Sequence, residues 1–150
     1  MKKFLTAIII TALTMVISGC KSFEKIYKDT ISVEDAIAEK NKHDSSTNPA
    51  YKLIIMNDLQ KKLVEMKGVY VKDIIPSTNI DYDFCIIIEF SSDSQFAQCM
   101  VYSDDIDTIA KIIKGKTKIN VLGDFGRIFT LLDNSIIKLE ILRSEIKILE

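Results

Sequence analysis

The chain opens with an unbroken apolar stretch and continues with amphipathic patterns. Phe4 to Ile17 holds only apolar and small residues, and two lysines precede it. A short positive segment followed by such a run is typical of a signal peptide. A membrane-spanning helix needs ~20 apolar residues, and this run stops short of that at Cys20-Lys21. We therefore expect residues 1–19 to be a signal segment that is removed.

Helical patterns follow. Residues 21–31 are polar with scattered apolar positions, which leaves open a tether or the start of a helix. Ser32, with acidic residues two and three positions later, predicts a helix start. The next residues on one helical face predict a short helix ending near Asn41: the apolar Val33, Ala36 and Ile37, followed by Lys40. His43 to Asn48 has loop composition, and Tyr51 to Met56 is compatible with helix or strand.

From residue 63 onward the apolar residues alternate with polar ones, as in β-strands. The predicted strands are Leu63–Ile75, Ile80–Phe90, Phe96–Tyr102, Thr117–Leu122 and Arg127–Leu142. Gly68 inside the first strand indicates a bulge or bend. Ser91 to Ser94 is predicted as a hairpin loop, and Gly123 to Gly126 as the turn before the last strand. An interruption of that strand at Asp133-Asn134 is left open.

One helix is expected between the third and fourth strands. Ser103 or Asp104 can cap it, apolar residues recur at helical spacing, and Gly115 stands where a helix would stop. Three strands, a helix and two further strands is the order of the OB-fold, a five-stranded Greek-key barrel. The predicted fold is therefore β-rich, with that barrel preceded by a short N-terminal helix. We divide the chain into residues 1–19 (signal peptide), 20–50 (tether and short helix) and 51–150 (barrel domain).

The segment Ile17-Ser18-Gly19-Cys20 resembles the bacterial lipobox. The resemblance implies cleavage between Gly19 and Cys20 and attachment of diacylglycerol to the Cys20 thiol. Each buried methylene contributes about 0.8 kcal/mol, so the two or three acyl chains of such proteins hold them firmly in a bilayer. The implied location is the cell envelope. Lys21, rather than Asp, after the cysteine favours the outer membrane if the organism has one.

The region from Leu63 to Leu142 resembles the bacterial tRNA-anti-like OB family. The stretches that carry this resemblance are Val64–Val71, Ala97–Tyr102, Lys114–Gly123 and Leu131–Ile137. Members of that family often carry Cys where this chain has Ser135. The resemblance implies the fold and transfers no activity.

The net charge and the cysteines limit which kinds of partner and cross-link the chain can have. The formal net charge of −1 becomes −3 once the two lysines of residues 1–19 are removed, which argues against broad binding to nucleic acid. Apart from Cys20, the cysteines are Cys85 and Cys99. They fall on neighbouring predicted strands, and a five-residue loop would set them opposite each other. Export permits a disulfide between them, and burial as two small apolar residues is the alternative.

No catalytic constellation emerges from the remaining candidates. His43 is the single histidine, which rules out His-rich metal sites. The acidic group Asp104, Asp105 and Asp107 lacks the glycine and distal glutamate of a calcium loop, so helix capping explains it better. Gly123 and Gly126 with Arg127 are too few for a phosphate loop and indicate a strand turn.

A basic surface with stacking rings is a further candidate. Its residues would be Lys111, Lys114, Lys116, Lys118, Tyr102 and Phe125. The alternative is that these lysines occupy the ordinary solvent positions of a helix end and an alternating strand.

The hypothesis is a non-enzymatic envelope lipoprotein without cofactor or metal, held to the membrane by the lipid on Cys20. Its barrel would bind an envelope protein, a glycan or a small ligand. One alternative is binding of single-stranded nucleic acid or oligosaccharide by the barrel face. Another is a structural or surface-antigen role, in which the helix at residues 33–41 contacts a partner.

Overall fold

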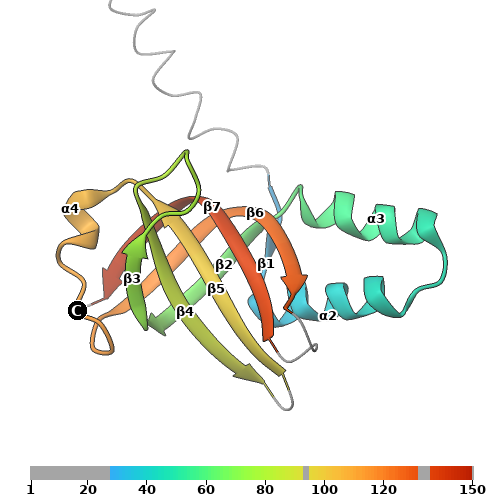
Figure 1. The fold of residues 1–150 in the computed structure, drawn as a ribbon, viewed down its shortest axis with the longest axis horizontal. Coiled ribbons are helices and arrows are strands. Elements are labelled where there is room, and N and C mark those ends of the chain that lie inside the picture. The colour runs from blue at the N-terminus through green and yellow to red at the C-terminus, as the bar shows by residue number, and fades with distance from the viewer. Residues whose placement is uncertain (1–27, 93–94, 132–135, 150) are drawn as a thin grey trace, which may run out of the picture.

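The computed structural model describes residues 28–92, 95–131 and 136–149 as a β-rich fold with a helical hairpin beside a twisted sheet (Figure 1). The helices are α2 (Val33–Ser45), α3 (Pro49–Leu59) and α4 (Ile106–Ile109). The strands are β1 (Thr30–Ile31), β2 (Leu63–Tyr70), β3 (Asp73–Pro76), β4 (Phe84–Ser92), β5 (Gln95–Ser103), β6 (Lys118–Thr130) and β7 (Ile136–Leu149). The signal segment and Cys20 lie outside the described residues.

Helix α2 begins as predicted and ends later. The Ser32 hydroxyl accepts a hydrogen bond from the Asp35 amide at 3.0 Å, and the buried face is the expected one. The predicted end near Asn41 is wrong, because the helix continues to Ser45. An ion pair between Lys40 and Asp44, one turn apart, stabilises this last stretch. Only residues 46–48 of the predicted loop connect the two helices.

The ambiguous segment from Tyr51 to Met56 is helical and belongs to α3. The Asn48 side chain caps the helix by accepting a hydrogen bond from the Ala50 amide at 3.0 Å. Proline occupies the first turn, where its missing amide hydrogen costs nothing. Ile55 and Leu59 are the buried residues of α3, so one side of this helix faces the rest of the fold.

The sheet order is β1-β2-β6-β7-β5-β4-β3. The pairs β1–β2 and β5–β7 are parallel, and the other neighbours are antiparallel. The predicted strand Leu63–Ile75 is divided between β2 and β3, with Val71 and Lys72 between them. The Val71 amide donates to Thr117 O at 3.3 Å, and the Lys72 amide donates to Ile87 O at 2.9 Å. The chain therefore passes from the β6 side of the sheet to the β4 side within two residues.

The bend expected at Gly68 is confirmed. Its φ is +62°, a value that favours glycine, and the register between β2 and β6 shifts between Met66 and Val69. The Gly68 amide donates to Oδ1 of Asn120 at 2.8 Å. A side-chain amide thus replaces the backbone partner lost at the bulge.

The turn predicted at Gly123–Gly126 is wrong. These residues lie inside β6, and Arg127–Thr130 end β6 rather than beginning the last strand. The two glycines allow β7 to approach β6 closely. A Cβ at Gly123 would lie 2.6 Å from Cγ2 of Ile141, and a Cβ at Gly126 would lie 3.0 Å from the backbone oxygen of Glu140. The interruption considered at Asp133-Asn134 lies outside the described residues.

Two other boundaries also differ from the prediction. Strand β4 begins at Phe84 rather than Ile80. Helix α4 covers a single turn, with Asp105 rather than Ser103 or Asp104 as its cap. Gly115 does reverse the chain with a φ of +71°, but it follows turns rather than helix.

The main core is formed chiefly by residues from one face of the sheet, together with buried residues of α2, α3 and α4. Its fully buried residues include Val33, Ile86, Ile88, Leu139 and Ile141. A smaller cluster on the other side of the sheet is formed by Cys85, Ile87 and Tyr102. Burying an aliphatic or aromatic side chain contributes about 1.5–3 kcal/mol, so β4 and β5 are stabilised from both faces. Among the described helices, none has the length and apolar character needed to cross a bilayer.

Candidate binding site

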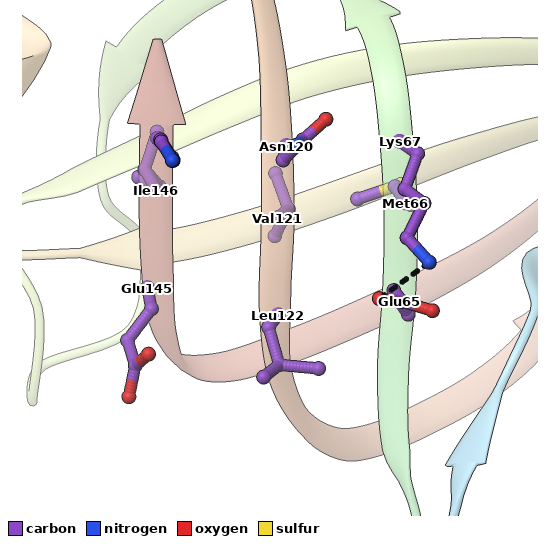
Figure 2. A pocket seen from close by; sticks show the side chains of 9 residues that line it. Glu65, Met66, Lys67, Asn120, Val121, Leu122, Glu145 and Ile146 are labelled. Carbon is purple, nitrogen blue, oxygen red and sulfur yellow. Dashed lines mark ion pairs between the residues drawn. The ribbon is translucent and has the colours of Figure 1, made fainter.

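A groove of about 260 Å³ lies over three neighbouring strands, β2, β6 and β7 (Figure 2). The strand register aligns its lining in rows across the sheet. The lining residues are Glu65, Met66, Lys67, Asn120, Val121, Leu122, Glu145, Ile146 and Lys147. Because all of them stand on paired strands, the backbone beneath the groove is rigid.

The groove has mixed charge. Lys67 Nζ and Glu65 Oε1 form an ion pair at 3.0 Å on β2, and both side chains remain partly exposed. Glu145 and Lys147 are exposed on β7. Asn120 lies on β6, between β2 and β7, and its side chain accepts the hydrogen bond from Gly68 at the bulge. Acids and bases alternate here, so the groove presents hydrogen-bond donors and acceptors without one dominant charge.

An exposed aromatic ring continues this face. Tyr70 and Lys118 are register partners at the end of β2, and Lys118 Nζ lies 5.0 Å from the ring centroid of Tyr70. The tyrosine is 54% exposed. A cation over one ring face is a favourable contact. The lysine therefore helps to keep the flat Tyr70 ring in place beside the polar groove.

A second cation–aromatic pair lies near the other end of β6. Arg127 makes two hydrogen bonds to the Glu140 carboxylate, at 2.6 and 2.8 Å. Its guanidinium also lies 4.9 Å from the ring centroid of Phe129. The hydrogen bonds to Glu140, followed by the charge of that carboxylate, raise the pKa of Arg127 above its ordinary value. The Arg127 guanidinium is therefore engaged by Glu140 within the chain.

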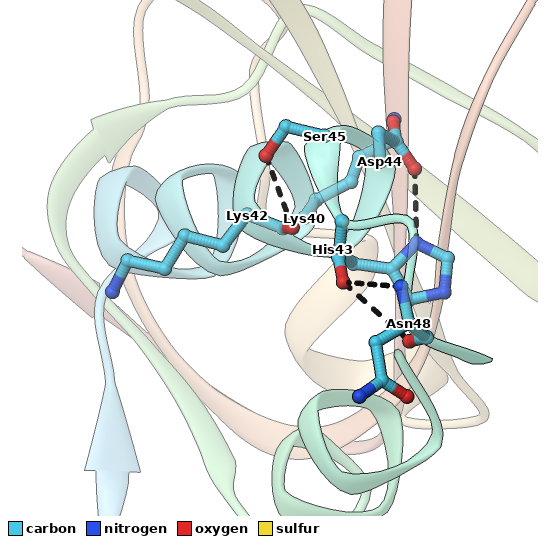
Figure 3. A network of polar contacts seen from close by, with 7 residues as sticks. Lys40, Lys42, His43, Asp44, Ser45 and Asn48 are labelled. Carbon is cyan, nitrogen blue, oxygen red and sulfur yellow. Dashed lines mark hydrogen bonds and ion pairs between the residues drawn. The ribbon is translucent and has the colours of Figure 1, made fainter. Parts of the chain in front are cut away.

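A pocket of about 320 Å³ lies where the end of α2 meets the end of β6. It is lined by Lys40, His43, Asp44, Met56, Ile128, Phe129 and Thr130. Asp44 pairs with the buried Lys40 ammonium, and its Oδ1 lies 3.0 Å from Nδ1 of His43, within hydrogen-bond distance (Figure 3). Burial raises the pKa of Asp44, but hydrogen bonds from Lys40 and His43 outweigh it, and the net pKa is lowered.

This arrangement changes the interpretation of His43. It belongs to the last turn of α2, not to a loop. The Asp44 carboxylate is engaged by both Lys40 and His43, so it is held as a structural partner rather than as a general base. The pocket therefore holds a structural polar network at the junction of helix and sheet.

Asp124 forms a third polar cluster, which sequence reasoning missed because its residue was assigned to a turn. Its carboxylate accepts from Lys28 Nζ at 2.6 Å and from Arg143 Nε at 2.8 Å. Burial raises its pKa, but the Lys28 hydrogen bond and the Arg143 charge outweigh that effect and lower the net pKa. Arg143 has a φ of +48°, and its amide donates to the Tyr82 hydroxyl at 3.0 Å.

The cysteines are not opposite each other. Cys85 pairs with Tyr102 and Cys99 pairs with Ile88, so the two side chains lie on opposite faces of the sheet. Both are free and buried. Burial raises the pKa of Cys85 to about 11 and that of Cys99 to about 12. The alternative of two small buried residues fits this structure, and a disulfide between them does not.

The remaining candidates have structural roles. Asp105 caps α4 by accepting from the Thr108 amide at 3.0 Å, and Asp104 accepts from the Asp83 amide at 2.7 Å. Among residues 28–92, 95–131 and 136–149, no three histidine, cysteine or acidic side chains gather as metal ligands would.

The predicted basic surface with Tyr102 and Phe125 as stacking rings is wrong, because both rings are buried. The lysines of that surface have other positions. Lys114 pairs with Asp73, and Lys118 lies over Tyr70. The aromatic ring beside a lysine on the exposed sheet face is thus Tyr70. Alternation from the buried Val64 and Met66 would place Tyr70 on the core face, and the register shift at Gly68 turns it outward, so the sequence offered only the glycine as a signal.

Comparison with known proteins finds likenesses among solved structures alone. No family model and no curated protein matches the chain. Among solved structures, it is similar to the asparaginyl-tRNA synthetase of Entamoeba histolytica in complex with asparaginyl-adenylate, with a TM-score of 0.36 and 13% identity. The alignment covers 59% of this chain and 21% of that protein.

Proposed function

We propose that this chain is an exported lipoprotein of the cell envelope, anchored by acyl chains on Cys20. The observation that carries this proposal is the segment Ile17-Ser18-Gly19-Cys20 directly after the apolar run. A thiol at the cleavage site offers the nucleophile to which diacylglycerol is attached. Lys21 at the next position favours the outer membrane where the organism has one.

We further propose that the sheet is an OB-like five-stranded barrel of the tRNA-anti-like kind. Counting β2 and β3 as one bent strand gives the order β2/β3-β6-β7-β5-β4, which returns to β3. The hydrogen bonds of Val71 to one side and Lys72 to the other support this closure. The parallel β5–β7 pair supports it as well, because the third and fifth strands of the barrel are then neighbours.

The function that this geometry supports best is non-enzymatic binding of a polar ligand on the β2–β6–β7 groove. An envelope oligosaccharide fits the groove's chemistry, because alternating donors and acceptors suit hydroxyl groups and the Tyr70 ring offers an apolar surface beside them. The net charge of −3 after removal of residues 1–19 favours a neutral ligand over a polyanion.

Metabolic labelling tests the anchor. Cells producing the natural chain and the variants Cys20→Ala and Cys85→Ala are grown with radioactive palmitate. We expect label on the natural chain and on Cys85→Ala, since Cys85 is buried and not a lipid site. Label on Cys20→Ala, or none on the natural chain, contradicts the anchor.

Nuclear magnetic resonance titration with cell-wall oligosaccharides tests the groove. We expect amide shifts that centre on Tyr70, Asn120 and Lys147, and loss of these shifts in Asn120→Leu. Arg127→Ala is the matched control, because its side chain lies apart from the groove lining. Shifts confined to other strands contradict the groove, and turnover of the oligosaccharide contradicts a non-enzymatic role.

Single-stranded nucleic acid is the second candidate. The observation that favours it is the Lys118–Tyr70 pair, a ring and a cation on one exposed strand end. Such rings stack bases and such cations contact phosphates. Oligonucleotide binding that weakens with salt would support this candidate, and absence of binding at low salt would end it.

A further inference from the structure

Helix α3 leaves an apolar face without a partner within the described chain. Leu53 is 61% exposed, Ile54 is 63% exposed and Tyr51 is 47% exposed, while Ile55 and Leu59 face the core. A helix beside a water-facing sheet ordinarily carries polar residues on its outer side. Several large exposed apolar residues within one turn of helix therefore indicate a contact surface.

Helix α3 carries few charged residues. From Pro49 to Asn57 the single ionised side chain is Lys52. The acidic neighbours are paired within the chain: Asp58 with Lys62 at 2.8 Å, Glu39 with Lys42 at 2.7 Å, and Asp44 with Lys40. Lys52 shares the helix side of Ile55 and Leu59, so the exposed face itself is formed by Tyr51, Leu53 and Ile54. Such an apolar face suits the interface of a lipid bilayer.

The position of the helix relative to the chain start brings this face near the anchor point. The Leu63 amide, four residues after the end of α3, donates to Asp29 O at 2.9 Å. In Figure 1, α3 and the start of β1 lie on the same side of the molecule, with α2 beneath them. The eight steps from Cys20 to Lys28 span at most about 29 Å when extended.

The shortness of α3 keeps its exposed residues close to the end of the helix. An α-helix rises 1.5 Å per residue, so Leu53 lies only about 9 Å along the axis from Leu59. The exposed Leu53 is thus close to the helix end that leads to β2 and its contact with Asp29, within the reach of a tether that begins in the bilayer. A soluble protein partner would have no such geometric reason to lie against this side.

We propose that the exposed face of α3 lies in the interface of the same bilayer that holds the acyl chains of Cys20. Leu53 and Ile54 enter below the headgroups, and the Tyr51 hydroxyl remains at headgroup level. This inference rests on the proposed lipid anchor. It adds a second point of contact, which fixes the orientation of the sheet relative to the membrane where a lipid tether alone would leave the body free to rotate.

Site-directed fluorescence tests the contact in the full lipidated protein. Ile54→Cys carries an environment-sensitive thiol label, and the buried Cys85 and Cys99 are protected from labelling. The protein is reconstituted into vesicles of phosphatidylethanolamine and phosphatidylglycerol that contain brominated lipid as quencher. Ile113→Cys is the matched control, because Ile113 is 59% exposed and follows α4 at the opposite end of the fold (Figure 1).

We expect about threefold stronger quenching of the label at position 54 than at position 113, as for an interfacial helix. Protein that floats with the vesicles while both labels are quenched equally overturns this contact and leaves the lipid anchor intact. Cross-linking of position 54 to a second copy, without lipid quenching, also overturns it in favour of a dimer. Protein that does not float with the vesicles overturns the anchor and this inference together.

Discussion

The ammonium of Lys28 donates a hydrogen bond to the carboxylate of Asp124 at 2.6 Å. Arg143 from β7 binds the other oxygen of the same carboxylate at 2.8 Å. The Asp124 side chain is only 8% exposed, so one nearly buried acid joins the start of the described chain to β6 and β7. The segment that leads from the proposed anchor is thereby fastened to the sheet.

Replacing this acid tests its contribution to stability. We expect Asp124→Asn to lower the free energy of unfolding by about 2 kcal/mol, because hydrogen bonds to charged groups are lost. Urea denaturation measures the change. The control is Asp81→Asn, at an exposed loop position. Equal stability of the two variants would contradict a stabilising role for Asp124.

The same variant has a pH dependence of defined sign. The Asp124 pKa is lowered in the fold, so its stabilisation is complete above the unfolded pKa of about 3.9. It is lost as pH falls through the still lower folded pKa. We expect the gap in unfolding free energy between the natural chain and Asp124→Asn to be constant near neutral pH and to shrink under acid. A gap that grows under acid would contradict the assignment.

Close packing at Gly123 gives a second prediction. A side chain there would meet Ile141 and the Leu142 carbonyl, so we expect Gly123→Ala to cost about 2 kcal/mol through overpacking. Gly115→Asn is the control, because nothing lies within 4 Å of a Cβ there and asparagine tolerates a positive φ. Thermal unfolding compares the two, and a smaller loss for Gly123→Ala would contradict the close approach of β6 and β7.

Thiol chemistry gives a third prediction. Burial raises the pKa of Cys85 to about 11 and that of Cys99 to about 12. Since the thiolate is the reactive form, we expect both to react with a thiol reagent at pH 8 only after unfolding in urea. Rapid reaction of the folded protein would contradict the burial of the two thiols, and a disulfide between them found by mass spectrometry would contradict their placement on opposite faces.

Two neighbouring isoleucines of α3 give a fourth prediction. Ile55 is 5% exposed and Ile54 is 63% exposed. We expect Ile55→Ala to cost about 2–5 kcal/mol because it leaves a cavity. Ile54→Ala should change stability by no more than about 0.5 kcal/mol. Chemical denaturation measures the unfolding free energy of both variants. Similar losses would contradict the placement of Ile55 in the core and Ile54 on the surface.

The strands could be predicted where alternation is regular, as along β5, and the start of α2 could be predicted from its cap at Ser32. The β6–β7 connection could not. A glycine pair after an alternating segment has the pattern of a turn, but Gly123 and Gly126 are required by the neighbouring strand. This reason exists only in the folded sheet, and the misplaced turn also concealed the Asp124 cluster.

The site was predicted less well than the fold, for a related reason. The groove combines β2, β6 and β7, whose register depends on the bulge at Gly68 and on shifts along β6. A shift of one residue moves every side chain to the other face. For this reason alternation alone would have placed Tyr70 in the core, although it is exposed. Tyr102 and Phe125, the rings considered for a basic surface, are both buried.

The central claim is that Cys20 carries the lipid that holds this chain in the envelope. The most direct measurement is mass spectrometry of the amino-terminal peptide of the protein extracted from membranes. The expected peptide begins at Cys20 and carries a diacylglyceryl group on its sulfur. A peptide that still contains residues before Cys20, or that begins there with an unmodified thiol, would contradict the account.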